Sequence, residues 1–466
     1  MRETTGSRAN YGVLALILIV GFAVRLWSMR WPPFPIDMND WIAWGEHVLR
    51  AGPSGFYTDT LFSDSAPGYV YVMRLTAAIK NAFFASADVG TYHFLYRLPP
   101  VLFDLATTAL IFFTVQRVFD DQPQPVDQPA DTSATSRSRL SLAIVAGAAY
   151  ILNPAIILNS AIWGQIDATF TFFMLLTMLL LLQGKLEGAG VSYIVAFLIK
   201  PQAISLAPAI AVLVLMRYPV RRWLIAGAIA IVMAYSVLFP FLGFNAFGRL
   251  YTLLNKSIET YPYTSLFTYN LWGIYGFWQD DTVPLGAGLT PRLVGMLLYI
   301  IGIVYGVALM IRQLRRATND ALTVFFFSTY FTFLPVMVTT RMHERYLYPV
   351  LPFLIIFAFM YYLRNHSGRA FSAIRGVLNV PFLLYVATTA LHTINLYYVY
   401  LYYLHYDTGG VDRANTLFYF IEGTARLWSV LTLLIFIGFA LMAPSWSLPR
   451  RDEQPQLGSL TDGEPA

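Results

Sequence analysis

Two carboxylates near the start of the chain have the type and spacing that acid–base chemistry needs. Asp37 and Asp40 stand three residues apart, beside Trp41 and Trp44, so a helix would carry both carboxylates on one face. Aromatic neighbours that exclude water make a carboxylate more basic, and it can then take a proton from a hydroxyl. The alternative is that one of the two caps a helix at the membrane surface.

Two further acidic residues lie in turn-like segments. Asp64 comes shortly before Pro67-Gly68-Tyr69, where it could contact a substrate or simply hold the turn together. Asp167 ends the segment Trp163-Gly164-Gln165-Ile166-Asp167. A tryptophan face suits a sugar ring, and the side chains of Gln165 and Asp167 suit its hydroxyls. Asp167 could equally do no more than favour the start of the next helix.

Two basic residues stand close to or within apolar stretches. Arg97 precedes Pro99-Pro100, and Lys200 interrupts an apolar region at Lys200-Pro201-Gln202. An unpaired cation near hydrocarbon is costly, which makes such residues functional candidates, and an anionic lipid phosphate would suit either. The alternative for Arg97 is that it reaches up to the headgroups. The alternative for Lys200 is a structural ion pair, with Asp104 as its partner.

The segment His343-Glu344-Arg345-Tyr346 is a compact polar turn before an apolar run. His343 and Arg345 are candidates for phosphate or sugar binding, or for capping the helix that follows. One His beside one Glu does not reproduce the zinc spacing of metalloproteases, so a metal is not indicated and no cofactor is expected. Tyr263, in an outer loop rich in aromatics and hydroxyls, could belong to a carbohydrate platform or to an interfacial belt.

The composition identifies the element that must position these residues. Of the 466 residues, 57% are hydrophobic and 12% charged, whereas soluble domains carry about 25% charge. Apolar runs of about twenty residues recur along the chain, which predicts an all-α polytopic membrane protein and not a β-barrel. Its arginines lie in short loops, so the net charge of +5 serves membrane orientation and does not indicate nucleic acid.

Counting positive charges in the loops predicts about twelve spans with both termini in the cytoplasm. The segment 67–84 is amphipathic and is expected to lie in the membrane interface without crossing. Residues 191–199 and 203–216 form a broken pair interrupted at depth. Residues 1–443 are then one transmembrane domain, with outer loops at 30–94 and 243–290. The segments 116–140 and 444–466 are expected to be flexible and cytoplasmic.

The order of the motifs resembles a known family. Asp37-Met38-Asn39, Pro67-Gly68-Tyr69, Trp163 to Ala168, Lys200-Pro201-Gln202 and His343 to Pro349 occur in sequence. Together they are similar to bacterial relatives of glycosylphosphatidylinositol mannosyltransferase II, which are GT-C glycosyltransferases. The run Ser65-Ala66-Pro67 departs from the Tyr-Pro-Pro that such relatives commonly show.

The resemblance implies a function and roles. It implies a polyprenyl-phosphate-linked sugar donor, usually mannose, a lipid or glycan acceptor, and transfer on the outer face of a prokaryotic plasma membrane. Asp37 matches the general base of the family, and Asp64 and Asp167 match polar site residues of the outer face. Asp40, beside Asp37, stays a candidate for substrate binding. By the same pattern Arg97, Lys200, His343 and Arg345 would bind the lipid phosphate. A polymerase or ligase of lipid-linked oligosaccharides, and a transporter or flippase, remain alternatives.

Overall fold

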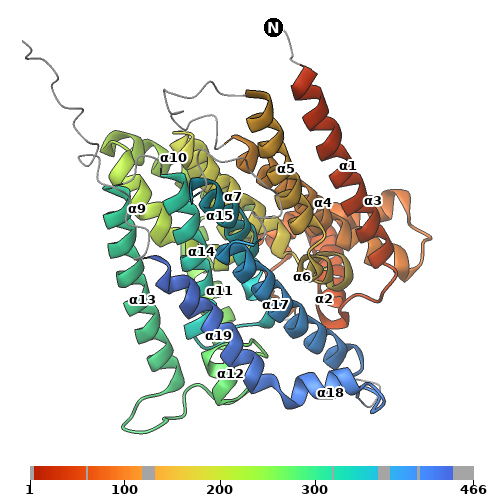
Figure 1. The fold of residues 1–466 in the computed structure, drawn as a ribbon. Helices are drawn as coiled ribbons and strands as arrows, with labels where there is room; N and C mark the ends of the chain where they lie inside the picture. The colour runs from red at the N-terminus through yellow and green to blue at the C-terminus, as the bar shows by residue number, and fades with distance from the viewer. Residues whose placement is uncertain are drawn as a thin grey trace, which may run out of the picture.

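The computed structural model describes residues 5–58, 61–117, 132–316, 320–365, 378–406 and 410–443, and these residues form helices and no β-strands. Figure 1 shows the arrangement. In chain order the helices of the first half are α1 (Thr5–Ser28), α2 (Pro35–Ala51), η1 (Pro53–Gly55), α3 (Pro67–Phe83), α4 (Val89–Arg117), α5 (Thr132–Ile151), α6 (Pro154–Ile157), the π-helix η2 (Leu158–Trp163), α7 (Asp167–Leu182), α8 (Leu186–Ile199), η3 (Pro201–Leu206) and α9 (Ala207–Arg217).

The second half begins with α10 (Val220–Leu242), α11 (Ala246–Glu259) and α12 (Leu271–Tyr275). It continues with α13 (Pro291–Leu314), α14 (Ala321–Val338), η4 (Glu344–Leu347), α15 (Val350–Asn365), α17 (Val380–Leu404), α18 (Thr416–Gly423) and α19 (Ala425–Leu441). The segments predicted to be flexible, 116–140 and 444–466, fall largely outside the described residues, although α5 already begins at Thr132. The predicted outer loop 243–290 contains two helices, α11 and α12.

The chain is an all-α, multi-pass membrane protein, as the composition predicted. Among the described residues, seven helices are long and apolar enough to cross a membrane, and up to nine if each of two bent helix pairs counts as one span. This is fewer than the predicted twelve. The difference lies in α7, α8 and the η3–α9 segment, which are apolar but too short to meet the length of a span.

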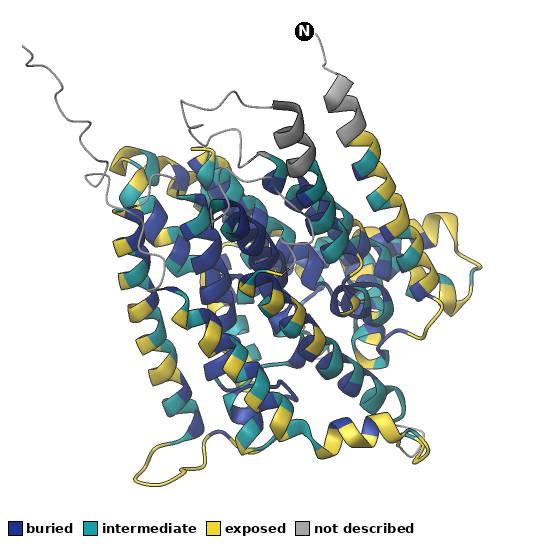
Figure 2. Ribbon diagram, in the orientation of Figure 1, coloured by how far each residue is buried: buried dark blue, intermediate teal, exposed yellow. Residues whose placement is uncertain are grey.

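Burial divides the bundle into a centre and a shell. α14 and α15 are buried along most of their length, whereas α1, α10 and α13 bury only about a fifth of theirs (Figure 2). The outer helices expose large apolar side chains such as Leu224, Ile231 and Ile301. An apolar surface on this scale suits contact with lipid, because lipid is the solvent that does not penalise it.

The predicted helix break at Lys200 is confirmed, and the chain reverses its direction there. Arg222, at the start of α10, donates to Glu187 at the start of α8, so α8 begins and α9 ends at the same end of the molecule. Between them Lys200 has an extended backbone that ends α8, and Pro201 starts η3. Lys200 therefore lies at the deep turning point of two short helices.

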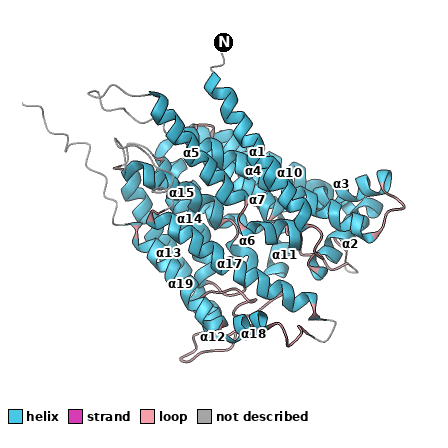
Figure 3. Ribbon diagram, turned by 45° about the vertical axis from the view of Figure 1, so that its right-hand side comes forward, coloured by secondary structure: helices cyan, strands magenta, loops and turns pink. Residues whose placement is uncertain are grey.

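α2 and α3 stand together at the side of the bundle (Figure 3). α3 covers the segment predicted to be interfacial, and neither helix qualifies as a span. Gly68 lies against the chain break described above: a Cβ there would be 2.5 Å from the carbonyl oxygen of Leu198. The glycine of the Pro67-Gly68-Tyr69 motif thus permits close packing of α3 on the end of α8.

Candidate functional site

The first turn of α2 positions Asp37. Pro35 occupies the first helical position, which suits proline, and Phe34 precedes it as an N-cap without a side-chain hydrogen bond. The Phe34 amide donates to the carbonyl of Trp163 (3.1 Å), and the two rings stack with centroids 4.1 Å apart. The start of α2 is therefore fixed to the Trp163 turn.

Asp37 does not cap its helix. Its Oδ2 accepts a hydrogen bond from Nε1 of Trp163 (2.7 Å) and another from Nε2 of Gln165. No hydrogen bond joins its Oδ1 to the part of the chain that the structure describes, and the residue is half-buried. One oxygen is thus held while the other remains available to a substrate.

The burial of Trp163 contradicts its predicted role as a sugar platform. Its side chain is completely buried, with one ring face stacked on Phe34. Gln165 is also buried. Both side chains orient Asp37 and offer no open face to a sugar ring.

The π-helix η2 explains how this turn is built. It ends at Gly164, whose φ of 93° is a left-handed conformation that favours glycine, and a Cβ there would lie 2.7 Å from Met38. The amides of Gly164 and Gln165 both donate to the Asn159 carbonyl (3.1 and 2.9 Å). π-Helical turns are frequent at functional sites, and this one directs Trp163 toward Asp37.

Asp167 and Lys200 form a buried ion pair. Nζ of Lys200 donates to Oδ1 of Asp167, and Oδ2 accepts from Asn159 (3.0 Å). The side chain of Asp167 is 1% exposed and that of Lys200 is 11% exposed. Asp167 lies in the first turn of α7 but does not cap it, because α7 has no side-chain cap. Its carboxylate is used for the ion pair with Lys200. The ammonium also lies 5.0 Å from the ring centroid of Tyr346.

The predicted alternative of a Lys200–Asp104 pair is wrong, because Asp104 has another cation. Its Oδ2 accepts from Arg25 (3.0 Å) and Ser160 (2.5 Å), and its Oδ1 accepts from the Tyr348 hydroxyl. All these contacts are buried. Asp104 thereby connects α1, the π-helix and the end of η4.

The turn at 341–345 brings in the second cation. Nη1 of Arg345 donates to Glu344 (2.9 Å) and contacts Nδ1 of His343 (3.2 Å), and no side chain caps η4. Arg345 lies in the electrostatic field of Asp37 and Asp167. The turn itself is held by Arg341, which has a left-handed backbone (φ 65°) and makes two hydrogen bonds to Asp281 (2.8 and 2.9 Å).

Asp40 and Asp64 complete the group. Desolvation, followed by repulsion from Asp37 and Asp64, raises the pKa of Asp40 to about 6. Desolvation also raises the pKa of Asp64, against the attraction of Arg345. Asp64 is nevertheless exposed to solvent. We call the set Asp37, Asp40, Asp64, Asp167, Lys200, His343 and Arg345 the charged cluster.

Two predicted site residues have other contacts. The Arg97 guanidinium is buried and donates to the carbonyls of Met29 (2.8 Å), Trp31 (3.0 Å) and Ala161 (3.2 Å), so it neither reaches the headgroups nor faces the cluster. Its donors satisfy carbonyls where α1 and the π-helix end. The ring of Tyr263 packs on Trp278 (5.1 Å), and its carbonyl accepts a hydrogen bond from the Arg341 amide (2.9 Å).

Three residues at the cluster were missed. Asn159 holds Asp167, Tyr346 lies under Lys200, and Tyr261 packs its ring on His343 (5.7 Å). Tyr261 and Tyr346 could have been noted from their motifs. Asn159 carried no signal, because its position depends on the π-helical turn.

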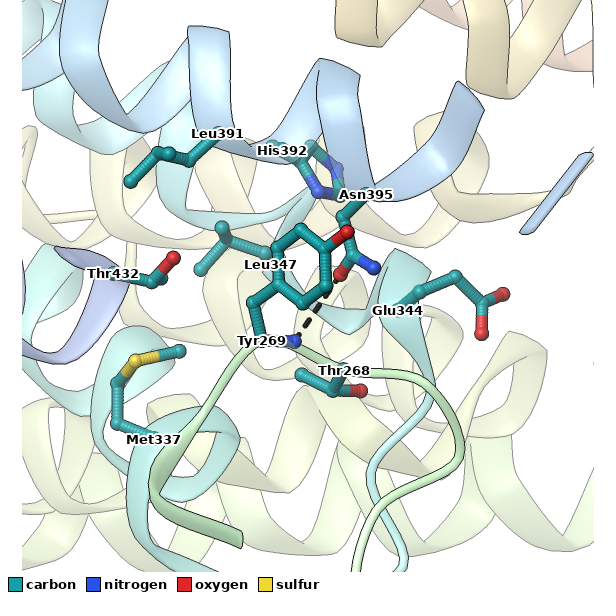
Figure 4. A pocket seen from close by; sticks show the side chains of 9 residues that line it. All are labelled: Thr268, Tyr269, Met337, Glu344, Leu347, Leu391, His392, Asn395 and Thr432. Atoms are coloured by element: carbon teal, nitrogen blue, oxygen red, sulfur yellow. Dashed lines mark hydrogen bonds between the residues drawn. The ribbon is translucent and has the colours of Figure 1, made fainter. Parts of the chain in front are cut away.

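A small cavity lies behind the cluster (Figure 4). It has room for about one water molecule, and its lining includes Glu344, Tyr269 and His392. Neither ring nitrogen of His392 nor the Tyr269 hydroxyl has a hydrogen-bond partner in the described chain. The described residues contain no group of three or more side chains placed to hold a metal ion.

The fold and the site together define a multi-pass helical membrane protein with a cluster of carboxylates and cations where α2, α7, the α8–η3 break and η4 meet. Over residues 49–272, just under half of the chain, it is similar to the protein family described as GPI transamidase subunit PIG-U. The matched range includes Asp64, Asp167 and Lys200 but neither Asp37 nor Arg345. No curated protein matches the chain. The matched family is described as a transamidase subunit, so the match does not specify mannosyltransferase II.

Proposed function

We propose that the chain is an inverting glycosyltransferase that moves a hexose, with mannose as the expected sugar, from a polyprenyl-phosphate donor to a glycolipid or another acceptor. One observation carries the proposal: Asp37, a carboxylate fixed by two donors, shares a cluster with the cations Lys200 and Arg345. Transfer to a hydroxyl needs a base at the acceptor and positive charge at the leaving phosphate.

In this proposal the unengaged oxygen of Asp37 removes the proton of the acceptor hydroxyl. The acceptor oxygen attacks the anomeric carbon from the face opposite the phosphate. The bond between the anomeric carbon and the phosphate oxygen breaks, and its electron pair leaves with the polyprenyl phosphate. The anomeric configuration is inverted, and Asp37 passes its proton to solvent.

Lys200 and Arg345 stabilise the leaving phosphate. Lys200 is already committed to Asp167, whereas Arg345 keeps a buried Nε without a hydrogen-bond partner in the described chain. That N–H is a preorganised donor, and such donors stabilise developing charge more strongly in a water-poor site than in water. His343 and Tyr261, which contact each other, form the adjoining wall for the sugar or the phosphate.

The charge distribution supports an extracytoplasmic site. Arg217, Arg312 and Arg364 occupy the last turns of α9, α13 and α15. These turns lie at the end of the bundle where α1 begins, opposite α12 and α18 (Figure 1). By the positive-inside rule we assign this end to the cytoplasm, together with both termini. The plasma membrane of a prokaryote is the location that the family resemblance implies.

The similarity to a GPI transamidase subunit favours a second candidate. The chain would then bind a glycolipid within a larger complex and transfer no sugar itself. The same cations would hold the lipid phosphate, while Asp37 would bind a hydroxyl without accepting its proton.

Purified protein incubated with polyprenyl-phosphate-mannose separates the two candidates. The glycosyltransferase releases free polyprenyl phosphate only when an acceptor lipid is added, and the product carries one more hexose by mass spectrometry. A binding subunit retains the labelled glycolipid but releases no polyprenyl phosphate with any acceptor. A transporter would move the donor between leaflets and leave it intact.

A further inference from the structure

Helix α11 has three faces with different chemistry. Ala246 and Leu250 are buried against the protein. Thr252 and Lys256 lie on an exposed polar face. A third face is exposed and apolar, with Phe247, Tyr251 and Ile258 at intervals of four and seven residues, and Phe244 precedes it.

The apolar face is large and open. Phe244 is 90% exposed and Tyr251 69%, and Phe247 and Ile258 are about half exposed. Contiguous apolar surface of this kind marks an interaction site, because exposing it to water is costly. α11 is too short and too polar to be a span.

This face continues the lipid-facing surface of a spanning helix. α10 qualifies as a span and exposes most of its length. Gly243, with a φ of 67°, turns the chain from α10 into α11. Across that turn Phe239 packs on Phe244 (5.3 Å) and Tyr235 on Phe247 (6.0 Å). The exposed stripe of α11 is thus an extension of the surface that α10 presents to lipid.

We propose that α11 is a membrane-surface helix whose stripe Phe244, Phe247, Tyr251 and Ile258 enters the acyl region of the bilayer. Arg249 and Lys256, both exposed, lie on the flanking polar face and reach the phosphates of the headgroups. An amphipathic helix of this composition binds by burying its apolar face while its cations stay at the interface. The occupant of the stripe is lipid, and this does not depend on the proposed function.

The C-terminal end of α11 is hydrogen-bonded to the turn that carries Arg345 of the charged cluster. Nη1 of Arg341 donates to the Ile258 carbonyl (2.9 Å) and to Glu259 (2.9 Å). Arg341 begins the turn that ends in Arg345. A helix held at the bilayer surface therefore fixes the level of that turn relative to the headgroups.

The absence of cysteine from the chain permits a direct test by single-site labelling. The variants Phe247→Cys, Tyr251→Cys and Ile258→Cys carry a nitroxide on the stripe, and Thr252→Cys carries it on the polar face one residue from Tyr251. The full-length protein is reconstituted in vesicles of phosphatidylcholine and phosphatidylglycerol. Collision rates are measured with oxygen, which concentrates in the acyl region, and with a water-soluble nickel chelate.

The proposal expects oxygen to dominate at 247, 251 and 258 and the nickel chelate to dominate at 252. Equal access of the nickel chelate to 251 and 252 would overturn it, because the stripe would then face water. Protection of 251 from both reagents would also overturn it, since another protein segment or a second copy would then cover the stripe. All four positions are exposed. Phe247→Cys removes the ring contact with Tyr235, so the comparison of 251 with 252 is the cleaner one.

Discussion

Asp37 and Asp40 are three residues apart on one helix, yet their surroundings make them different groups. Asp37 accepts hydrogen bonds from Trp163 and Gln165, which fix the orientation of its carboxylate. Asp40 has the negative charges of Asp37 and Asp64 beside it, and its pKa rises to about 6. Asp37 is therefore a carboxylate held in one orientation, whereas Asp40 is a carboxylate that is protonated more easily than in water.

Asp40 gives the protein a pH-dependent stability. Because its pKa of about 6 in the folded state exceeds the ordinary value of 3.8, folding favours the protonated form. The stabilisation is complete below pH 3.8 and is lost as the pH rises through 6. We expect Asp40→Asn to remove part of the fall in melting temperature between pH 5 and pH 7. Thermal unfolding in detergent measures this.

Identical pH profiles for wild type and Asp40→Asn would contradict the raised pKa. Glu46→Gln, on the same helix but paired with Tyr92 and Asn81, is the matched control and should leave the profile unchanged.

At the scale of elements, the site depends on irregular helices. The π-helix η2 carries Asn159 and Trp163, and the break between α8 and η3 carries Lys200. Each irregularity frees the chain to place a polar side chain inside apolar surroundings. The resulting Asp167–Lys200 ion pair joins the start of α7 to the residue that directly follows α8.

Removing one member of that pair should be more harmful than removing both charges. Lys200→Met leaves Asp167 buried with Asn159 as its remaining partner, and the expected loss is about 3–5 kcal/mol in the free energy of unfolding. The double variant Asp167→Asn/Lys200→Met should cost less than the sum of the single variants. Unfolding of all four proteins in detergent gives the coupling energy, and strictly additive losses would show that the pair contributes nothing.

The contact of α3 with α8 is a second test at this scale. In Gly68→Ala the new methyl group would lie 2.5 Å from the Leu198 carbonyl oxygen, so the backbone must move. We expect a loss of about 1–3 kcal/mol. Gly227→Ala, inside α10 with no atom within 4 Å of the new Cβ, should be neutral or stabilising. Equal melting temperatures for the two variants would show that α3 does not pack closely on α8 at Gly68.

At the scale of the whole molecule, composition and periodicity predicted the class of fold but not which apolar helices are long enough to span a membrane. Apolar runs of membrane length recur because every span obeys the same constraint, so a helical membrane protein could be inferred from sequence alone. The predicted twelve spans include α7, α8 and α9. All three are apolar but too short to meet the length of a span, and helix boundaries are the least certain part of a prediction from sequence.

The site was predictable where a motif holds its members together in sequence, as in Trp163 to Asp167. Tertiary packing brings together four residues that are far apart in the sequence, Asp37, Asp167, Lys200 and Arg345. The family resemblance had proposed a role for each of them. Trp163 was misjudged because an aromatic beside polar residues suggests a binding platform, whereas its stacking on Phe34 depends on how α2 meets the π-helix. Arg97 was misjudged because its acceptors are backbone carbonyls, which no sequence motif records.

The orientation of the molecule is directly testable. Val283 is exposed in the segment before α13, and Arg315 is exposed directly after that helix. In intact cells a membrane-impermeant maleimide should label Val283→Cys but reach Arg315→Cys only after permeabilisation. The wild type, which has no cysteine, is the blank. The reverse pattern would place the charged cluster on the cytoplasmic side.

The central claim is that Asp37 is the base of a sugar transfer. The decisive measurement is acceptor-dependent release of polyprenyl phosphate from polyprenyl-phosphate-mannose by wild type, Asp37→Asn and the control Glu46→Gln, each purified and folded. Loss of a general base predicts a fall in turnover of about 10²–10⁴-fold for Asp37→Asn with donor binding retained, and no change for Glu46→Gln. Turnover by Asp37→Asn close to that of the wild type would contradict the account.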